Sequence, residues 1–430
     1  MSSQVAFENM TAEQRAAIVQ ENMLTPQRWA REYPELGTGP VPIEPCISPE
    51  YYELEREYVF KHAWLNVGRV EEIPRAGDYL VKDIVVCNTS ILIARGKDGQ
   101  LQAFHNMCSH RGNKLVWDSQ GSCKAFRCKF HGWTFDLQGR LAGVTDEKAF
   151  FNLNKEENGL TPVSVDTWEG FIFINMDPRP EETLAEFMGE EIPGRIKGFP
   201  FHQRRWVKYE AELKCNWKVL LDAFSEGYHG TELHKRSIPA GGPPGNKYFH
   251  PALIELYKRH RFFSQVGNPD AKPSPTEAIC GRYQTTMTSQ MGGNAAEIPG
   301  TNPLKTPLWN LDVNVIFPNF WIGFTNGLTL TYNFWPLAVD RMVFDLRLGF
   351  DPVSTAAELV ASEMNKVRGR DADLEDLSTV EQTYSVLTSG AKTHFNLGDS
   401  EIVVRHGYKV LQDYIDHFRL KGASNREELE

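Results

Sequence analysis

Two cysteines and two histidines form a pair of short motifs in the first third of the chain. Cys108 and His110 make a Cys-x-His motif, and after seventeen residues Cys128 and His131 make a Cys-x-x-His motif. Thiolate and imidazole are both metal ligands, so the pattern indicates a metal site. Structural zinc is one candidate, although paired zinc ligands are more often two cysteines or two histidines. Because each motif supplies one ligand of each kind, the pattern favours a two-iron, two-sulfur cluster with two thiolates on one iron and two imidazoles on the other.

A glycine follows each motif, Gly112 after the first and Gly132 after the second. Glycine allows the tight turns that would wrap the chain around a cluster. Imidazoles in place of thiolates raise the reduction potential of such a cluster, which suits it to accept electrons from a ferredoxin. Cys123 lies between the motifs and is interpreted as a structural thiol.

A second candidate metal site lies further along the chain. His229 and His234 are five residues apart, which on a regular α-helix would turn them about 140° away from each other. They can face one metal only if the helix ends or distorts between them, and Gly227 and Gly230 allow that. Two histidines and one carboxylate on one face of Fe(II) leave other positions open for O2. The carboxylate must come from elsewhere in the sequence.

The stretches 105–112 and 128–136 closely resemble the cluster loops of Rieske non-haem iron ring-hydroxylating oxygenases, and in particular their large (alpha) subunits. The resemblance implies that the four motif residues bind a [2Fe-2S] cluster. It also implies that His229, His234 and Asp376 bind a separate mononuclear Fe(II).

The residues alone leave the third iron ligand open among several neighbouring acids. A helix expected to begin near Leu374 resembles the one that carries this ligand in the family, and Asp376 falls at the matching position. Glu375 is the second choice. Asp371, Asp373 and Glu375 also fit the simpler interpretation of acids at a helix N-terminus, where the helix dipole favours negative charge.

The resemblance gives Glu226 a distinct role. The matching carboxylate bridges a cluster histidine of one subunit, here His131, to an iron histidine of its neighbour, here His229, and couples the two metal sites. This arrangement implies a homotrimer, with or without a small beta subunit. Most ring-hydroxylating members have Asp here, whereas oxygenases of quaternary ammonium compounds also carry Glu. Asp222 precedes Glu226 by one helical turn, so we expect both on the same face as His229.

The elements that position these groups fall into two regions. Residues 63–178 contain short β-branched or aromatic segments separated by turn residues, which predicts a small all-β domain. Residues 179–430 mix helical and strand patterns, so the expected fold class is α+β, with a larger catalytic domain built from an antiparallel sheet and helices. Residues 1–62 are expected to form a helical segment that packs on the catalytic domain. We expect helices near 184–188, 217–228, 356–368, 374–389 and 402–417, and strands near 207–213, 314–317, 329–335 and 342–350.

One segment does not fit either pattern. Residues 236–301 are rich in proline, glycine and polar residues, which indicates a long irregular insert. Such inserts are more often lids or subunit contacts than simple connectors.

Bulk properties exclude several classes of protein. The net charge is −10, which argues against a nucleic-acid binder and against attachment to an anionic membrane. No secretory signal or membrane-spanning run is visible, and seven cysteines without regular spacing do not indicate a disulfide framework. We therefore expect a cytoplasmic enzyme with reduced thiols.

The chain lacks a glycine-rich dinucleotide-binding motif after a strand, so electrons from NAD(P)H must arrive through a separate ferredoxin, a flavin reductase or both. The residues around the cluster motifs are mostly basic, which makes them a candidate docking patch for an acidic redox partner or simply a solvated face. They are Arg111, Lys114, Lys124, Arg127 and Lys129.

The leading hypothesis is an oxygenase that hydroxylates an aromatic substrate with O2, in a pocket bordered by the aromatic stretch 315–324 and Phe224. Asp222 and Asn319 are its polar candidates. A monooxygenase of quaternary ammonium compounds is the alternative, because an aromatic cage also binds such cations. Two further hypotheses involve no oxygenase chemistry. One is a pure electron carrier, which would need only residues 63–178, and the other is a zinc-stabilised binding protein, which would need no iron.

Overall fold

The computed structural model describes residues 7, 9–238, 241–285 and 298–427, which form two compact units. Leu54–Phe187 is one unit, and Met1–Glu53 together with Met188–Glu430 is the other. The expected cluster domain, 63–178, falls within the smaller unit. The α+β fold class is confirmed, because helices and antiparallel sheets are both present.

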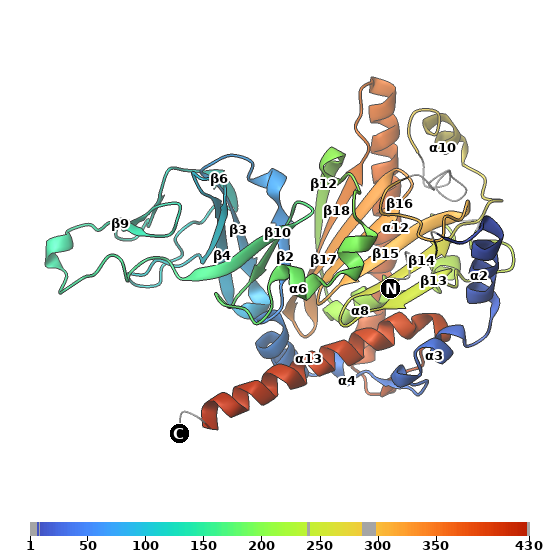
Figure 1. Cartoon of the computed structure of the whole chain (residues 1–430), viewed down its shortest axis with the longest axis horizontal. Helices are drawn as coiled ribbons and strands as arrows, with labels where there is room; N and C mark the ends of the chain where they lie inside the picture. Colours follow the sequence, from blue (N-terminus) through green and yellow to red (C-terminus); the bar gives the residue numbers. More distant parts are fainter. Residues whose placement is uncertain (1–6, 8, 239–240, 286–297, 428–430) are drawn as a thin grey trace. The chain divides into compact units, whose positions relative to one another are not determined.

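Within the described residues, the smaller unit has a main sheet of seven antiparallel strands in the order β2-β11-β10-β5-β4-β3-β6 (Figure 1). Asp98 and Gly99 lie in the turn between β4 and β5, as their hairpin signal predicts. The strands are β2 (Leu65–Arg69), β3 (Asp78–Ile84), β4 (Thr89–Arg95), β5 (Leu101–His105), β6 (Gln120–Ser122), β10 (Pro162–Trp168) and β11 (Phe171–Asn175).

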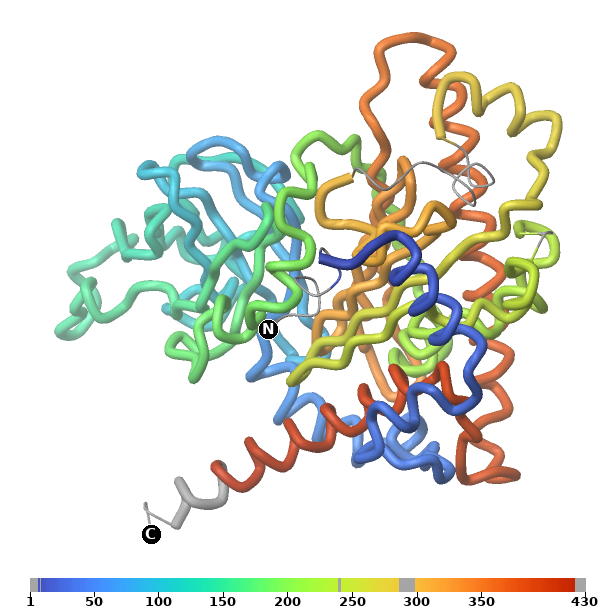
Figure 2. Tube along the Cα trace, turned by 45° about the vertical axis from the view of Figure 1, so that its right-hand side comes forward, coloured from blue at the N-terminus to red at the C-terminus, as the bar shows by residue number. Residues whose placement is uncertain are grey.

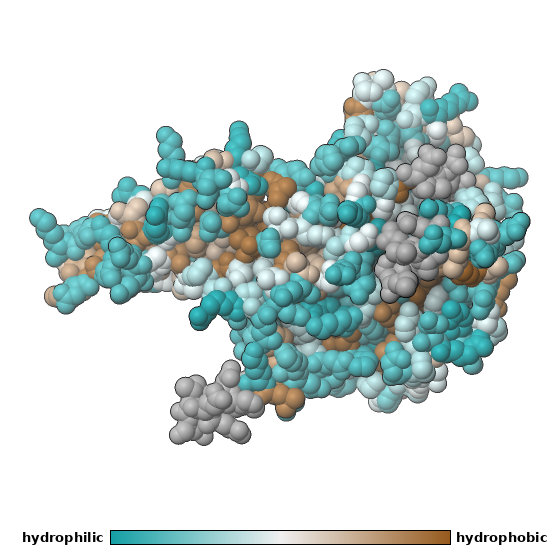
Figure 3. Space-filling model, in the orientation of Figure 1, coloured by the Kyte–Doolittle hydropathy of each residue, from teal (hydrophilic) through white to brown (hydrophobic). Residues whose placement is uncertain are grey.

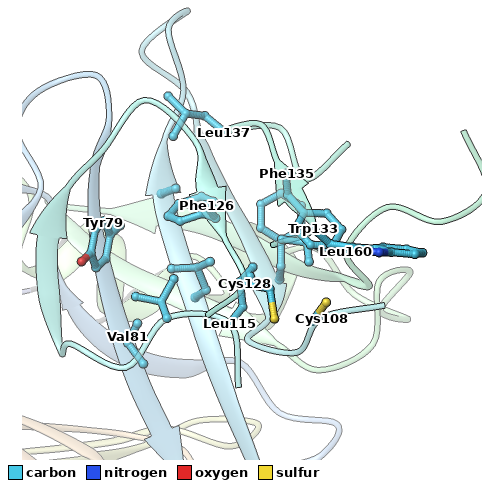
Figure 4. Packing of buried hydrophobic residues seen from close by; sticks show 14 of the residues in the cluster. Tyr79, Val81, Cys108, Leu115, Phe126, Cys128, Trp133, Phe135, Leu137 and Leu160 are labelled. Atoms are coloured by element: carbon cyan, nitrogen blue, oxygen red, sulfur yellow. The ribbon is translucent and has the colours of Figure 1, made fainter. Parts of the chain in front are cut away.

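A second, three-stranded sheet in this unit carries the later cluster motif. It consists of β7 (Phe126–Arg127), β8 (Thr134–Phe135) and β9 (Leu141–Gly143). Apolar side chains from both sheets meet in one buried core that includes Leu92, Phe104, Phe135 and Leu160 (Figure 4). The two cysteines of the motifs pack at the edge of this core, so its rigidity fixes where their sulfur atoms lie.

The larger unit is built around another sheet of seven antiparallel strands among the described residues, in the order β12-β18-β17-β16-β15-β14-β13 (Figure 1). Its strands are β12 (Arg205–Leu213), β13 (Leu253–Leu256), β14 (Arg261–Val266), β15 (Trp309–Ile316), β16 (Phe320–Thr325), β17 (Leu328–Ala338) and β18 (Arg341–Phe350). The helices of this unit include α7 (Glu191–Arg195), α8 (Trp217–Ala223), α9 (Gly230–Leu233), α10 (Pro275–Cys280), α12 (Ala356–Leu387) and α13 (Ile402–Glu427), and α6 (Leu184–Met188) joins the two units in sequence.

Helix α12 is one continuous helix, although the sequence predicts two. Glycine lowers helix stability by about 1 kcal/mol relative to alanine, and Gly369 lies in the gap between the two expected helices. The buried residues of α12 nevertheless recur every three or four positions, as in an uninterrupted amphipathic helix. They are Ala361, Ser362, Asn365, Gly369, Asp373, Asp376, Leu377, Val380 and Tyr384. Burial of this face outweighs the local cost, and the acids near Asp376 lie in mid-helix rather than at an N-terminus.

The expected irregular insert is also partly wrong. Residues 236–301 contain strands β13 and β14, which complete one edge of the larger sheet, and the short helix α10. β14 is buried at every position because it pairs with β13 on one side and β15 on the other. The many prolines and glycines lie between these elements. The parts of the insert at 239–240 and 286–297 lie outside the described residues.

The expected N-terminal segment, 1–62, belongs to the larger unit as far as Glu53, and its last residues, 54–62, fall in the smaller unit. Helix α2 (Ala12–Leu24) lies beside β13 and β14, with Val19 in a core shared with Leu253 and Phe262 (Figure 2). Asn22 donates from Nδ2 to the carbonyl of Ala252 at 2.7 Å. Three further helices, α3 (Arg28–Glu32), α4 (Glu44–Ile47) and α5 (Pro49–Leu54), follow, and β1 (Val41–Pro42) pairs with β19 (His394–Phe395).

The outer face drawn in Figure 3 is mainly hydrophilic, with apolar patches of limited extent. In the part of the chain that the structure describes, no helix has the length and apolar character needed to cross a membrane.

Candidate metal centres

The two cluster loops close with the same backbone pattern. The N–H of Cys108 donates to the carbonyl of Asn113 at 2.9 Å, and the N–H of Cys128 donates to the carbonyl of Trp133 at 2.8 Å. Gly112 and Gly132 donate back to the cysteine carbonyls at 2.9 and 3.0 Å. Both glycines have positive φ, 74° and 76°, which residues with a side chain rarely adopt. The sequence therefore builds two matching turns.

The four expected cluster ligands converge at the tips of these loops. The sulfur atoms of Cys108 and Cys128 face each other, and each cysteine is only 2% exposed (Figure 4). The rings of His110 and His131 lie 4.6 Å apart between centroids. Nδ1 of His110 is buried and has no hydrogen-bond partner among the described residues. A buried nitrogen left without a partner fits a metal ligand, so these residues fit a [2Fe-2S] cluster.

Neighbouring groups prepare the ligands for a metal. Trp133 stacks on the ring of His110 at 4.9 Å, and burial lowers the pKa of that histidine, which favours the neutral form that binds metals. Burial raises the pKa of the Cys108 thiol. Burial also acts to raise the pKa of the Cys128 thiol. The backbone N–H groups of Phe130 and His131 help to outweigh this effect, so the pKa of Cys128 is lowered.

Two short helices with a turn between them position His229 and His234, the expected iron ligands. Asn216 caps α8 by accepting a hydrogen bond from the N–H of Lys218, and the helix ends at Ala223 rather than near 228. His229 immediately precedes α9 and His234 immediately follows it. The helix therefore ends before the histidines, as their spacing requires. Glu226 lies outside α8, so the expectation that it shares a helical face with Asp222 is wrong.

Close packing explains the glycine in this turn. A Cβ on Gly227 would collide with the side-chain amide of Gln265 and lie 3.1 Å from Cβ of Phe249. A Cβ on Gly230 would lie 3.2 Å from the ring of Phe249. The turn can approach β14 this closely only because both positions lack a side chain.

His229, His234 and Asp376 come together although they lie on different elements. Each offers one ligand atom, and these atoms all lie within 4.8 Å of one another. Oδ1 of Asp376 is 3.4 Å from Nε2 of His229, and Oδ2 is 3.6 Å from Nε2 of His234. Two imidazole nitrogens and one carboxylate are the donor set of non-haem Fe(II) oxygenases.

A carboxylate holds the other nitrogen of each histidine. Oε1 of Glu226 lies 2.5 Å from Nδ1 of His229, and Oε2 accepts from the N–H of the same residue at 3.1 Å. Oε2 of Glu375 lies 2.8 Å from Nδ1 of His234. Both rings therefore present Nε2 to Asp376. Glu375, the second choice for the iron ligand, contacts the outer edge of His234.

Electrostatics at Asp376 also fit a cation. The residue is 4% exposed, and burial raises its pKa to about 6 despite the opposing charges of the two histidines. Its Oδ1 is buried without a hydrogen-bond partner among the described residues. Burial lowers the pKa of His229, but the bond to Glu226 outweighs it and leaves that pKa raised. A divalent ion would relieve this concentration of negative charge.

Asp222 lies in a different environment from the iron ligands. Its carboxylate accepts a hydrogen bond from the hydroxyl of Tyr408 at 2.7 Å, and the charge of Arg261 acts on it. These three residues help to line a cavity of about 20 Å³, room for about one water. Dense packing around the carboxylate raises its pKa to about 7. The described contacts therefore connect Asp222 to α13 rather than to the expected substrate pocket.

Replacing Asp222 with asparagine should change how stability depends on pH. Between about pH 4 and pH 7 the folded protein holds a proton that the unfolded chain releases, so this carboxyl lowers stability as the pH rises. Asparagine cannot ionise. We expect the free energy of unfolding of the variant to rise relative to that of the natural protein by about 1 kcal/mol per pH unit across this window, as measured by urea unfolding. Parallel stability curves would refute the raised pKa.

Aromatic side chains gather around Phe224, the residue that follows α8. Phe224 lies 4.9 Å from Tyr332 and 5.6 Å from Phe344, measured between ring centroids, and Trp321 stacks on Tyr332 at 4.6 Å. The hydroxyl of Tyr332 donates to Oδ1 of Asp373 at 2.9 Å, one helical turn before Asp376. Burial raises the pKa of Asp373 to about 8. No local pattern indicates this buried pair, because its two residues are 41 positions apart.

Asn319, the other polar candidate for the pocket, is fully buried at the start of β16. Its side-chain Nδ2 donates to the backbone carbonyl of Phe334 at 3.1 Å, and its backbone carbonyl accepts from the N–H of Phe334. Its described contacts bind the turn between β15 and β16 to β17.

Comparison with known proteins identifies both regions. A family model for the catalytic domain of the ring hydroxylating alpha subunit matches residues 201–417, and one for the Rieske [2Fe-2S] domain matches residues 63–162. The first match covers just over half of the chain.

Relatives with different substrates match at similar levels. The chain is 31% identical over 209 residues to the carnitine monooxygenase oxygenase subunit of Acinetobacter baumannii, covering 47% of this chain and 54% of the relative. It is 34% identical over 207 residues to the biphenyl 2,3-dioxygenase alpha subunit of Rhodococcus jostii, covering 45% and 43%. The matched region thus spans about half the length of these relatives. A crystal structure of the quaternary ammonium Rieske monooxygenase CntA shares the fold, with a TM-score of 0.69, 19% identity, and coverage of 90% of this chain and 98% of that chain.

Proposed function

The chain belongs to the family of Rieske ring-hydroxylating oxygenase alpha subunits, and from this premise we propose that it hydroxylates an aromatic substrate with O2 as the oxygenase component of a multi-protein system. The observation that carries the proposal is the convergence of His229, His234 and Asp376. Their donor set is the one that leaves Fe(II) with positions for O2.

Each metal group has a defined set of residues in this proposal. Cys108, Cys128, His110 and His131 hold the [2Fe-2S] cluster, and the convergent triad holds the Fe(II). When bound, these groups supply single-electron transfer and O2 activation. The protein's own contribution is to orient the ligands: stacking on Trp133 fixes His110, and the outer carboxylates fix the two iron histidines.

Glu226 is proposed to connect the two kinds of site across a subunit boundary. Its bond to His229 is the half of this bridge that lies within one chain. His131 borders a surface hollow of about 750 Å³, which leaves room for an approaching carboxylate from another subunit. This pairing supports a homotrimer, with or without a small beta subunit.

Replacing Glu226 with glutamine should retain both metals and slow electron transfer between them severely. The amide keeps the shape of the side chain but loses the charge that couples the two imidazoles. Stopped-flow reoxidation of the reduced cluster, with substrate and O2 present, measures this step. Rapid reoxidation at the rate of the natural protein would argue against a bridge.

Electrons are proposed to come from NAD(P)H through a ferredoxin, a flavin reductase or both. We also propose that the enzyme works in the cytoplasm, where NAD(P)H is available. Exposed basic and aromatic side chains surround the cluster loops. Arg111 lies over the ring of Phe130 at 5.5 Å, and Lys129 lies over Trp117 at 4.7 Å. This combination of charge and apolar area suits a small acidic redox protein.

The aromatic side chains on β16, β17 and β18 support the choice of substrate. Flat aromatic molecules bind through buried area and ring contacts, and the buried rings of Trp321, Tyr332 and Phe344 pack around Phe224, five residues before His229. The product carries one or both atoms of O2 as hydroxyl groups.

Monooxygenation of a quaternary ammonium compound is the second candidate. Glu226 stands where such oxygenases carry Glu, and Asp373 is a buried acid beside aromatic rings, whose raised pKa a bound cation would lower. Its Oδ2 has no hydrogen-bond partner among the described residues.

Product analysis across a substrate panel separates the two candidates. The protein, with a reconstituted ferredoxin and reductase, is supplied with aromatic compounds, some bearing hydroxyl or carboxylate groups, and with carnitine-like and choline-like compounds. We expect hydroxylated aromatic products. Turnover of the ammonium compounds with no aromatic compound oxidised would overturn the substrate class but not the oxygenase assignment.

A further inference from the structure

Two consecutive carboxylates on α12 contact opposite edges of one histidine. Oδ2 of Asp376 is 3.6 Å from Nε2 of His234, and Oε2 of Glu375 is 2.8 Å from Nδ1 of the same ring. Successive side chains on a helix point about 100° apart, so two neighbours cannot both face one metal from the same side. They can, however, enclose an imidazole between them, and this helix does so.

Other groups hold Glu375 in place. Ser237 donates from its hydroxyl to the same oxygen of Glu375 at 2.7 Å. The guanidinium of Arg368, two turns earlier on α12, donates to the carbonyl of Ser237 at 2.7 Å and lies 3.4 Å from the buried carboxylate of Glu277 on α10. The segment after His234 is thus attached to α12 at two points, through a side chain and through its backbone.

Glu375 therefore has a geometric role that differs from that of Glu226. Glu226 lies three residues before His229 and orients it within one turn of chain. Glu375 lies 141 residues after His234 and connects two distant segments, both of which carry iron ligands. This connection sets the separation between the histidine pair and Asp376 before any metal enters.

We propose that Glu375 is a positioning residue for the mononuclear metal, which fixes His234 with Nδ1 as the hydrogen-bond donor and Nε2 free to bind, and that Ser237 fixes Glu375. The inference rests on the proposed function, because it takes His229, His234 and Asp376 as the metal ligands. It adds a residue that touches neither substrate nor metal.

Metal binding by the protein with its cluster in place and its mononuclear site emptied tests this role. Co²⁺ alone is the probe, its affinity is measured by equilibrium dialysis, and its EPR signal is recorded with the cluster oxidised. Glu375→Gln keeps an acceptor of the same shape but removes the charge. We expect it to weaken Co²⁺ binding roughly 10- to 100-fold, as removal of such outer partners does in other metal sites. The EPR signal of bound Co²⁺ should also shift, because the neutral amide holds the ring of His234 less firmly than the carboxylate does.

Matched variants separate positioning from general disruption. Asp371→Asn changes an acid on the same helix that is bonded to Arg370 and exposed, and it should leave Co²⁺ affinity and signal unchanged. Ser237→Ala leaves every charge in place and should weaken binding by a smaller factor, roughly threefold to tenfold, on the same grounds. This variant decides the question if Glu375→Gln fails to fold.

The outcomes distinguish this inference from the proposed function. If the natural protein does not bind Co²⁺, or if Asp376→Ala binds Co²⁺ as the natural protein does, the metal site itself is wrong. If the natural protein binds Co²⁺ and Asp376→Ala does not, but Glu375→Gln and Ser237→Ala bind Co²⁺ as the natural protein does, only the positioning role is wrong. Weakened binding in both, with Asp371→Asn unchanged, establishes the role.

Discussion

Replacing Asp376 with alanine is expected to remove the mononuclear iron and abolish turnover while the cluster spectrum persists. Asp376 supplies the only carboxylate within reach of both Nε2 atoms in the described ligand group, so its loss leaves two neutral imidazoles, too few to hold Fe(II) firmly. Iron should fall from about three to about two atoms per chain, since the cluster holds two of them. We expect turnover to fall by at least ~10³-fold, because O2 activation requires the metal.

Iron analysis, visible absorbance and product formation measure these effects on the same sample. Asp371→Asn, on the same helix but exposed, is the matched control and should retain about three irons and full activity. Retention of the third iron in Asp376→Ala, with its loss in Glu375→Ala, would show that the iron ligand is the neighbouring residue.

Replacing Cys128 with serine is expected to abolish the cluster. Its sulfur faces that of Cys108 in a buried site, and serine is a much poorer ligand for iron than thiolate. The protein should lose its brown colour and the reduced-state EPR signal of a histidine-ligated two-iron cluster. Replacement of Cys108, His110 or His131 should have the same effect.

Cys123→Ser provides the matched control for this prediction. Cys123 lies between the two motifs and is partly buried, but the described contacts do not bring it to the paired sulfur atoms. The variant should retain the full cluster spectrum. An unchanged spectrum in Cys128→Ser would contradict the assignment of the cluster site.

The cluster loops were predictable because all their information is local. Four ligands and two glycines lie within 25 residues, and the backbone bonds that close each loop span five residues. The histidine pair was predictable for a related reason: the spacing of His229 and His234 excludes a regular helix, and the glycines around them supply the break.

The carboxylate partners could not be found in the same way. Asp376 lies 142 residues after His234, and only resemblance to a family selected it from among its acidic neighbours. The role of Glu375 depends on which edge of His234 it meets, and that depends on the rotation of α12. The buried face of this helix sets that rotation through tertiary packing, which a local pattern does not contain.

Tertiary context also overrode local signals in the fold. The expected break between 368 and 374 is absent, and α12 continues because its buried face is uninterrupted. Strands β13 and β14 were missed because the segments around them are rich in turn residues, whereas pairing with β15 stabilises them. The position of Asp222 follows from Tyr408, on a helix almost two hundred residues away.

Single turnover under ¹⁸O2 tests the central claim most directly. The natural protein, with both metals loaded and its cluster chemically reduced, is mixed with an aromatic substrate and ¹⁸O2, and the products are analysed by mass spectrometry. We predict ¹⁸O in the hydroxylated product of the natural protein and none with Asp376→Ala. Reoxidation of the cluster in the natural protein without ¹⁸O in any compound of the panel would contradict the account and favour an electron carrier.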